Sequence, residues 1–288
     1  MKINLTQNKN FKLFKIISKV AQENNQTVYI VGGYVRDLLM QRKAPTDIDF
    51  VTEQSGIELA KAVGKELGDL KVSVFKTYGT AMIKYQDLDL EFVGARKESY
   101  SEDSRKPAVE TGTLEDDQKR RDFTVNALAI SLNAENFGEL IDPFNGREDM
   151  QNKILRTPLE PAQTYSDDPL RMMRAIRFAS VLHFEIEKNS LEAIKQEAER
   201  IKIVSMERIM VEFNKIMLSE KPSVGLKLME ETTLLEKIIP ELTALRGIEE
   251  VEGQTHKDNF WHTLEVVDNI SKNTDNLWLR WAALLHDI

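Results

Sequence analysis

Two aspartates, Asp47 and Asp49, alternate in the segment DIDF, which otherwise has the apolar character of a strand. Side chains at positions i and i+2 of a strand lie on the same face, so the two carboxylates point together. They repel unless a cation lies between them, and carboxylate oxygens suit Mg²⁺. Glu91 lies in a later strand-like segment, DLDLEFVGAR, with Asp89 on the same face. Three converging acids predict two-metal phosphoryl or nucleotidyl transfer, whereas a lone D-x-D is more often only a polar strand entry.

A glycine pair, Gly32 and Gly33, follows the apolar segment TVYIV and precedes the helical segment YVRDLLM. Glycine lets the backbone approach a ligand closely, and a helix N-terminus favours phosphate. Arg36 lies one turn further on, where its guanidinium would hold a phosphate, and Asp37 is its expected partner. The pair matches neither the G-x-G-x-x-G fingerprint nor a P-loop, so a purely structural turn is the alternative.

A third pattern spaces one aspartate and three arginines three residues apart in DDPLRMMRAIRFA. They lie along one slowly drifting side of a helix: Asp168, Arg171, Arg174 and Arg177. One interpretation is a solvated basic face with an acidic N-terminus. The other is a ligand-facing stripe, because arginine pairs bidentately with base edges and a carboxylate accepts from an exocyclic amine. Such a stripe would select a nucleotide without a nucleic-acid template.

The composition sets the broad class of protein. A chain of 288 residues is expected to form two or more domains. Its net charge of -8 argues against a uniform coat of nucleic acid. Without cysteine there are no disulfides or thiolate metal sites, and a cytoplasmic setting is the default. No apolar run approaches the roughly 20 residues that span a bilayer, and the N-terminus lacks a secretory signal.

Strand-like segments alternate with one clear helix up to about residue 93, and helical periodicity dominates from Pro169 onward, so the boundary is expected near residues 145–165. The pattern predicts a mixed α/β part followed by an all-helical part. Residues 96–119 are polar and are predicted to form a long loop, whereas RRDFTVNALAI has helical spacing. The final LRWAALLHDI is helical without a cap, so the helix is expected to continue beyond Ile288.

The segments GGYVRDLLM, TDIDF, RRDFTVNALA and DDPLRMMRAIRFA, in this order, resemble those of the class II tRNA nucleotidyltransferases (CCA-adding enzymes) and the related bacterial poly(A) polymerases. The resemblance covers about residues 27–215. It implies an α+β fold with a polymerase-beta-like nucleotidyltransferase head, a mixed sheet with helices, at residues 1–150. An all-helical neck at 151–220 would carry the arginine helix, and a helical body would follow at 221–288.

The resemblance also implies a reaction, the addition of CMP, CMP and AMP from CTP and ATP to the 3' end of the tRNA acceptor stem. Asp47 and Asp49 would bind Mg²⁺, with Glu91 as the third catalytic carboxylate, ranked above Asp89 on this ground alone. The remaining family positions would bind the nucleotide. The glycine turn and Arg36 would hold its phosphates, Arg121 would contact it, and the stripe would select its base: Gly32, Gly33, Arg36, Arg121, Asp168, Arg171, Arg174 and Arg177.

Several alternatives stay open. The segment NALA and the long loop at 96–119 favour addition of the full triplet. A poly(A) polymerase, or a partial enzyme that adds only CC or only A, is the alternative within enzymes. An RNA-binding protein with an inactive head is the alternative of another class, against which the intact Asp47, Asp49 and Arg121 argue. The sequence leaves the oligomeric state open.

Near the C-terminus, His262 in FWHTLEVVDNI and the pair His286-Asp287 resemble the opening of a metal-dependent HD phosphohydrolase domain. Histidine and carboxylate ligands suit transition metals or magnesium. A further aspartate downstream would be needed to complete such a site. The interpretation preferred from the sequence is therefore two packed helices with His262 near the surface and no metal bound within this chain.

Overall fold

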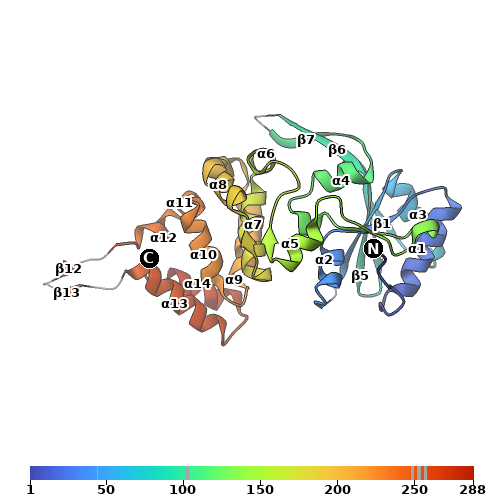
Figure 1. Ribbon diagram of the computed structural model, residues 1–288. Coiled ribbons are helices and arrows are strands. Elements are labelled where there is room, and N and C mark those ends of the chain that lie inside the picture. Colours follow the sequence, from blue (N-terminus) through green and yellow to red (C-terminus); the bar gives the residue numbers. More distant parts are fainter. Residues whose placement is uncertain (44, 102–103, 248–249, 252–253, 256–257) are drawn as a thin grey trace. The chain divides into compact units, whose positions relative to one another are not determined.

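The computed structural model describes residues 1–43, 45–101, 104–247, 250–251, 254–255 and 258–288. The chain divides into two compact units (Figure 1). The first comprises Met1–Tyr100 and Lys106–Asn152, and the second comprises Ser101–Arg105 and Lys153–Ile288. The first unit is α+β and the second is almost entirely helical, which confirms the predicted fold class. A separation of neck from body near residue 220 stays a prediction.

A seven-stranded mixed sheet forms the first unit, in the order β3-β4-β5-β2-β1-β8-β9. The central strands β2 and β5 pair in parallel, and the other described pairs in this sheet are antiparallel. The strands are β1 (Tyr29–Val31), β2 (Asp47–Thr52), β3 (Val72–Phe75), β4 (Thr80–Tyr85), β5 (Leu88–Gly94), β8 (Ala129–Ser131) and β9 (Leu140–Ile141).

The main core of this unit lies between one face of the sheet and the helices α1 (Phe11–Glu23) and α3 (Gly56–Glu66). Alternate residues of β2 and β5, such as Phe50 and Phe92, point into this core. Their rings stack with centroids 5.0 Å apart. Since neighbouring residues of a strand face opposite ways, the odd-numbered residues of both strands lie on the other face.

The predicted loop at 96–119 is wrong in part. Strands β6 (Arg96–Ser101) and β7 (Ser104–Thr111) form a two-stranded sheet, and α4 (Leu114–Lys119) follows. Residues 102–103 lie outside the described part. A ladder of this kind is built from backbone hydrogen bonds and needs no apolar periodicity in the sequence. Helix α4 begins with a capping box, because Thr113 and Asp116 satisfy each other's backbone N–H.

The helix predicted for RRDFTVNALAI is also wrong. The segment forms one 3₁₀ turn (Thr124–Asn126) and then enters β8. The Asp122 carboxylate accepts hydrogen bonds from the Phe123 backbone N–H and the Asn126 amide, both at 2.9 Å. Such local bonds offer the backbone an alternative to a helix. The following apolar residues pair with β1 as a buried strand.

Short helices complete the first unit, namely α2 (Gly33–Leu39) and α5 (Gly146–Gln151). The second unit contains α6 (Pro161–Asp167), α7 (Leu170–Leu182), α8 (Lys188–Glu197), α9 (Met206–Met217), α10 (Pro222–Glu231), α11 (Leu234–Ile238), α12 (Pro240–Ala244), α13 (Asn259–Ser271) and α14 (Leu277–Leu285). Two small strand pairs accompany them: β10 (Ile154–Leu155) with β11 (Glu185–Ile186), and β12 (Glu250–Val251) with β13 (Gln254–Thr255).

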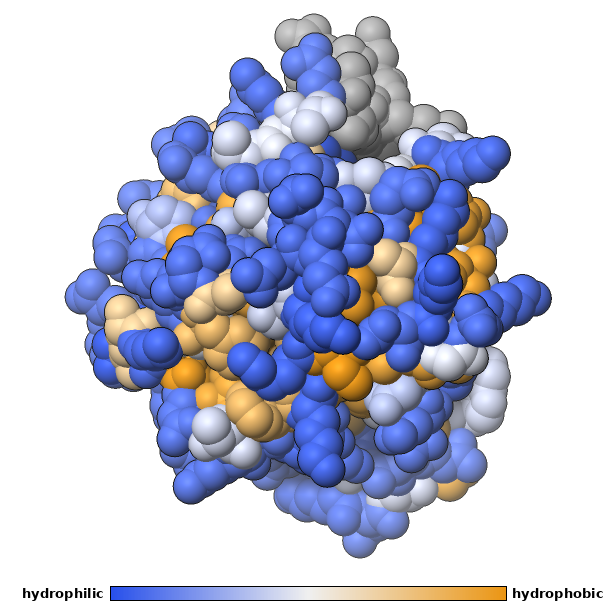
Figure 2. Space-filling view, turned by 90° about the vertical axis from the view of Figure 1, so that its right-hand side faces the viewer, coloured by the Kyte–Doolittle hydropathy of each residue, from blue (hydrophilic) through white to orange (hydrophobic). Residues whose placement is uncertain are grey.

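The face shown in Figure 2 is largely hydrophilic, with scattered apolar patches. Among the helices that the structure describes, none combines the length and the hydropathy needed to cross a membrane.

Candidate active site

The predicted catalytic carboxylates come together on the sheet. The parallel register sets Asp49 of β2 opposite Glu91 of β5, and Asp47 opposite Asp89. All four residues lie on the face away from α1 and α3, because the residues between them, such as Ile48, are buried in the core. Asp47 is exposed, while Asp49 and Glu91 are half-buried. The adjacent strands β2 and β5 therefore have an acidic face, and their opposite face is apolar and packs in the core.

Glu91 and Asp89 differ in their surroundings. The ammonium group of Lys84 forms an ion pair with Asp89, with an N–O distance of 3.2 Å. The charges that act on Glu91 are those of Asp49, Arg96 and Asp47. The Lys84 pair supports Glu91 as the third catalytic carboxylate, although that role stays a prediction.

Burial and like charge act together on this face. Burial raises the pKa of Asp49, and Asp47 raises it further, against the opposing effect of Arg121. The pKa of Glu91 is raised by burial first and then by Asp49, and Arg96 opposes the shift. A bound cation would favour the ionised carboxylates and reverse both shifts.

An all-oxygen donor set of this charge fits Mg²⁺. In two-metal sites such carboxylates hold ions about 3.5–4 Å apart.

Arg121 is the cation beside the carboxylates, and a buried acid holds it there. Asp117 of α4 is fully buried and accepts from Arg121 Nε at 3.0 Å, and Nη2 lies at the same distance from the same oxygen. Burial alone would raise the pKa of Asp117, but Arg121 and Arg120 lower it below its ordinary value. Asp49 and Asp117 likewise raise the pKa of Arg121 against the effect of burial. Asp49, Arg121 and Asp117 thus form a row in the first unit, in which the arginine lies between two carboxylates.

The glycine turn lies next to this row. Gly32 has φ of 75°, and a Cβ built on it would come within 2.8 Å of Arg121 Nη1 and 3.5 Å of Asp49 Oδ2. A side chain at this position would therefore strain the backbone and displace Arg121. Gly33 begins α2, and a Cβ there would meet only Arg36 Nη2, at an ordinary 3.7 Å.

Arg36 is buried behind the turn. It forms an ion pair with Asp37 at 2.8 Å, which confirms Asp37 as its partner, and Nη1 donates to Asn126 Oδ1 at 2.7 Å. Asn126 in turn donates to Asp122. This network joins the glycine turn to the RRDFTVN segment.

The arginine stripe lies in the second unit, on α7. Arg171, Arg174 and Arg177 are all half-buried, and the extended residue Asp168 precedes the helix. Asp168 Oδ1 accepts from the Leu170 backbone N–H at 3.3 Å. Arg177 Nε lies 2.5 Å from Glu212 Oε2 of α9. The predicted stripe is therefore a partly enclosed face rather than a fully solvated one.

His262, His286 and Asp287 also lie together, in the second unit. Their ligand atoms are all within 4.8 Å of one another, and among described residues they form the one such group of three or more histidine and acidic side chains. His262 lies on α13 and is exposed, whereas His286 and Asp287 directly follow α14. The two helices pack against each other as predicted.

Two residues of the active-site networks were missed from the sequence, Asp117 and Asn126. Asp117 lies in the polar segment that was predicted to be a loop, so its burial was not anticipated. Its position four residues before Arg121 was the available signal, because helical neighbours at this spacing can form ion pairs. Asn126 entered the sequence analysis only as the first residue of NALA, and its contact with Arg36 was not predicted.

Two family profiles match the chain. One is described as the poly(A) polymerase head domain and matches residues 28–156. The other is described as the probable RNA- and SrmB-binding site of polymerase A and matches residues 183–245.

Curated relatives include an A-adding tRNA nucleotidyltransferase from Aquifex aeolicus, 35% identical over 90% of this chain and 31% of the relative. A CCA-adding enzyme from Bacillus velezensis is 36% identical over 95% of this chain and 63% of the relative. The chain thus spans from about a third to just under two thirds of the length of these relatives.

Solved structures are similar over most of the chain. A tRNA nucleotidyltransferase complexed with a primer tRNA and an incoming ATP analog is 32% identical, with a TM-score of 0.76 over 94% of this chain and 75% of that one. The Thermotoga maritima CCA-adding enzyme complexed with tRNA is 27% identical, with a TM-score of 0.77 over 98% and 64%.

The electrostatics of Asp49 predict opposite effects of one substitution on stability and activity. Asp49→Asn should raise the Tm of the metal-free protein at neutral pH, because it removes a half-buried charge that its surroundings disfavour. The pKa of Asp49 is raised in the folded state, so the ionised side chain lowers stability as pH rises through that pKa. The stabilisation by Asn should therefore grow in thermal scans as pH rises above the ordinary aspartate pKa of about 4. A Tm that falls at neutral pH would contradict this account of the site.

The two glycines should respond differently to alanine. Gly32→Ala should lower the free energy of unfolding by about 1–2 kcal/mol or more, because φ is positive and the methyl group meets Arg121. Gly33→Ala is the matched control and should change it by less than about 0.5 kcal/mol, because the added methyl group makes only an ordinary contact. Urea unfolding of the two variants measures both, and equal losses would be the contrary result.

Proposed function

Because the chain belongs to the tRNA nucleotidyltransferase family, we propose that it adds CMP, CMP and AMP from CTP and ATP to the 3' end of tRNA. The observation that carries the proposal is the acidic face of β2 and β5, with Arg121 and the glycine turn beside it. The proposal extends to the cytoplasmic setting that the sequence favours. The substrates are taken from relatives, one of which was solved with a primer tRNA and an ATP analog.

The acidic face would carry the catalysis. Asp47, Asp49 and Glu91 would hold Mg²⁺, which when bound activates the attacking 3'-hydroxyl and stabilises charge on the leaving pyrophosphate. The protein's own contribution is a rigid set of oxygens, because the core on the other side of the sheet fixes both strands. Arg121 would add positive charge next to the phosphates of the nucleotide and is oriented for this by Asp117.

The glycine turn would admit the triphosphate. Gly32 leaves the backbone uncovered where a side chain would meet Arg121, and Gly33 begins the helix that follows. Arg36 is held by Asp37 and Asn126. We therefore assign Arg36 a supporting part, in which it supplies charge and holds the turn in place.

Base selection is assigned to α7. Asp168, Arg171, Arg174 and Arg177 would present acceptors and donors to a base edge, and an arginine fork with a carboxylate distinguishes cytosine and adenine from their competitors. The half-buried state of the three arginines supports this role, because such contacts gain strength where water is partly excluded.

A second function is favoured by the cluster near the C-terminus. We propose that His262, His286 and Asp287 are ligands of a metal site that opens an HD-type domain. His286 Nδ1 lies 2.7 Å from the Ala283 carbonyl oxygen. If that nitrogen carries the proton, Nε2 is left to bind a metal, which is the usual arrangement of a histidine ligand. His286 Nε2 lies 3.3 Å from Asp287 Oδ2.

Incorporation assays test the first proposal. With tRNA that lacks its tail, CTP should add two residues, and ATP should then add one. Asp49→Asn should lower the rate at least about 1,000-fold, because loss of a metal ligand removes several kcal/mol of transition-state stabilisation.

Other outcomes identify the alternatives. Addition of AMP only to tRNA that already ends in CC would indicate an A-adding enzyme, like the Aquifex relative. Extension of many RNAs by ATP alone would indicate a poly(A) polymerase. RNA binding without incorporation would indicate an inactive head.

Metal titration tests the second proposal. Calorimetry with Mn²⁺ on the Asp49→Asn background isolates the C-terminal cluster from the head. His286→Ala should weaken binding at least about tenfold, because it removes one ligand. The control is His183→Ala, an exposed histidine of the same unit that pairs with Glu220. Equal Mn²⁺ binding by both variants would exclude the site.

A further inference from the structure

A buried acid outside the arginine helix faces its last arginine. Glu212 of α9 is 4% exposed, and its Oε2 lies 2.5 Å from Arg177 Nε. We propose that Glu212 is a positioning residue that sets the direction of the Arg177 guanidinium and thereby the discrimination between nucleotides. This inference rests on the function proposed above for the arginine helix.

The geometry of the pair explains how an orientation is set. A guanidinium is planar and rigid, so a buried carboxylate in ion-pair contact with Nε limits the directions in which Nη1 and Nη2 can point. The ring of Phe178 provides a second restraint, because the Arg177 guanidinium lies 3.7 Å from its centroid. Burial of the acid raises the cost of separating the two charges. Glu212 thus restrains the Nε edge of the Arg177 guanidinium, and the Phe178 ring restrains one of its faces.

Glu212 is itself placed by its helix, which α14 holds. The indole ring of Trp281 stacks on Phe213, next to Glu212, with centroids 4.9 Å apart and an angle of 21°. Its Nε1 donates to Asn214 Oδ1 at 2.8 Å. Phe213 and Asn214, the two residues that follow Glu212, are therefore anchored to α14, and Glu212 Oε1 also accepts from Lys215 Nζ at 3.2 Å.

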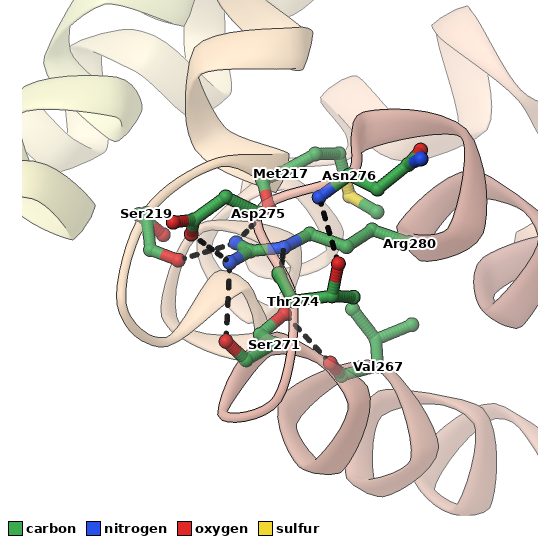
Figure 3. Close-up of polar contacts among 8 residues, drawn as sticks. All are labelled: Met217, Ser219, Val267, Ser271, Thr274, Asp275, Asn276 and Arg280. Atoms are coloured by element: carbon green, nitrogen blue, oxygen red, sulfur yellow. Dashed lines mark hydrogen bonds and ion pairs between the residues drawn. The ribbon is translucent and has the colours of Figure 1, made fainter.

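The end of α9 is held by Arg280 of α14, which is 1% exposed. Figure 3 shows its guanidinium among the carbonyl groups that end α9 and α13. Its nitrogens donate to the carbonyl oxygens of Met217, Ser219, Ser271 and Thr274, and to the Asp275 carboxylate, over 2.7–3.1 Å. Since Arg280 stabilises the same helices without contacting Arg177 in any of these bonds, it offers a control for stability.

The test is a double-mutant cycle with Glu212→Gln and Arg177→Lys. Glutamine keeps the size of the side chain and removes its charge, and lysine keeps the charge and removes the fork. Glu212→Gln should reduce the ratio of CTP to UTP affinity about tenfold, because loss of the buried charge removes the ion pair that orients Arg177. The double variant should discriminate no worse than Arg177→Lys alone, because Glu212 acts through Arg177. Calorimetry with CTP and with UTP measures the ratio of affinities for each variant. The ratio of kcat/KM for the two nucleotides, with tRNA as acceptor, provides a second measurement.

The matched control is Arg280→Lys, which should lower Tm by roughly 5 °C and leave the CTP to UTP ratio unchanged well below Tm. A parent chain that binds both nucleotides equally contradicts both the assigned function of the stripe and the role of Glu212. If the parent discriminates and Glu212→Gln discriminates equally well, only the positioning role is wrong. Losses of discrimination that add in the double variant also overturn it.

Discussion

The crowding of negative charge on β2 and β5 is the constraint around which the first unit is organised. Asp49 and Glu91 lie opposite each other on adjacent strands, where repulsion and burial both disfavour their ionised forms. The strands stay paired because their other face packs in the core, where Phe50 stacks on Phe92. A register slip of one residue would bury the acids and expose the rings, so the core also fixes the site. Apolar packing thereby stabilises a charge arrangement that is unfavourable without a cation.

Much of this part of the fold can be predicted from local patterns. The alternation in DIDFVT predicts both the bounds of β2 and the shared face of its acids, because side-chain direction in a strand depends only on position. The helix α7 is likewise given by its apolar spacing from Leu170 onward. In such segments the local preference of the residues agrees with their burial in the fold, so the sequence pattern alone predicts the element.

The segment from residue 96 to residue 130 could not be predicted in this way. Its structure depends on side chains that bond to nearby backbone, such as Asp122, and on pairing with a distant strand. A polar hairpin and a 3₁₀ turn leave no apolar period. Asp117 was missed for the same reason, since a fully buried acid in a polar stretch is recognised only once Arg121 is seen beside it. Glu212 is similar, because its partner lies 35 residues earlier in the chain.

The same device occurs in both units, namely an arginine oriented by an acid. Asp117 holds Arg121 and Glu212 holds Arg177, each by contacts that include Nε. A free arginine side chain would lose about 2 kcal/mol of rotamer entropy on being ordered by a ligand. An arginine that is already ordered loses less on binding, so more of each new contact appears as affinity. Burial of the acid makes the arrangement durable, because separating the pair would leave an uncompensated charge inside the protein. Under the function proposed for the arginine stripe, such rigidity would matter, because fixed donors would then distinguish one base from another.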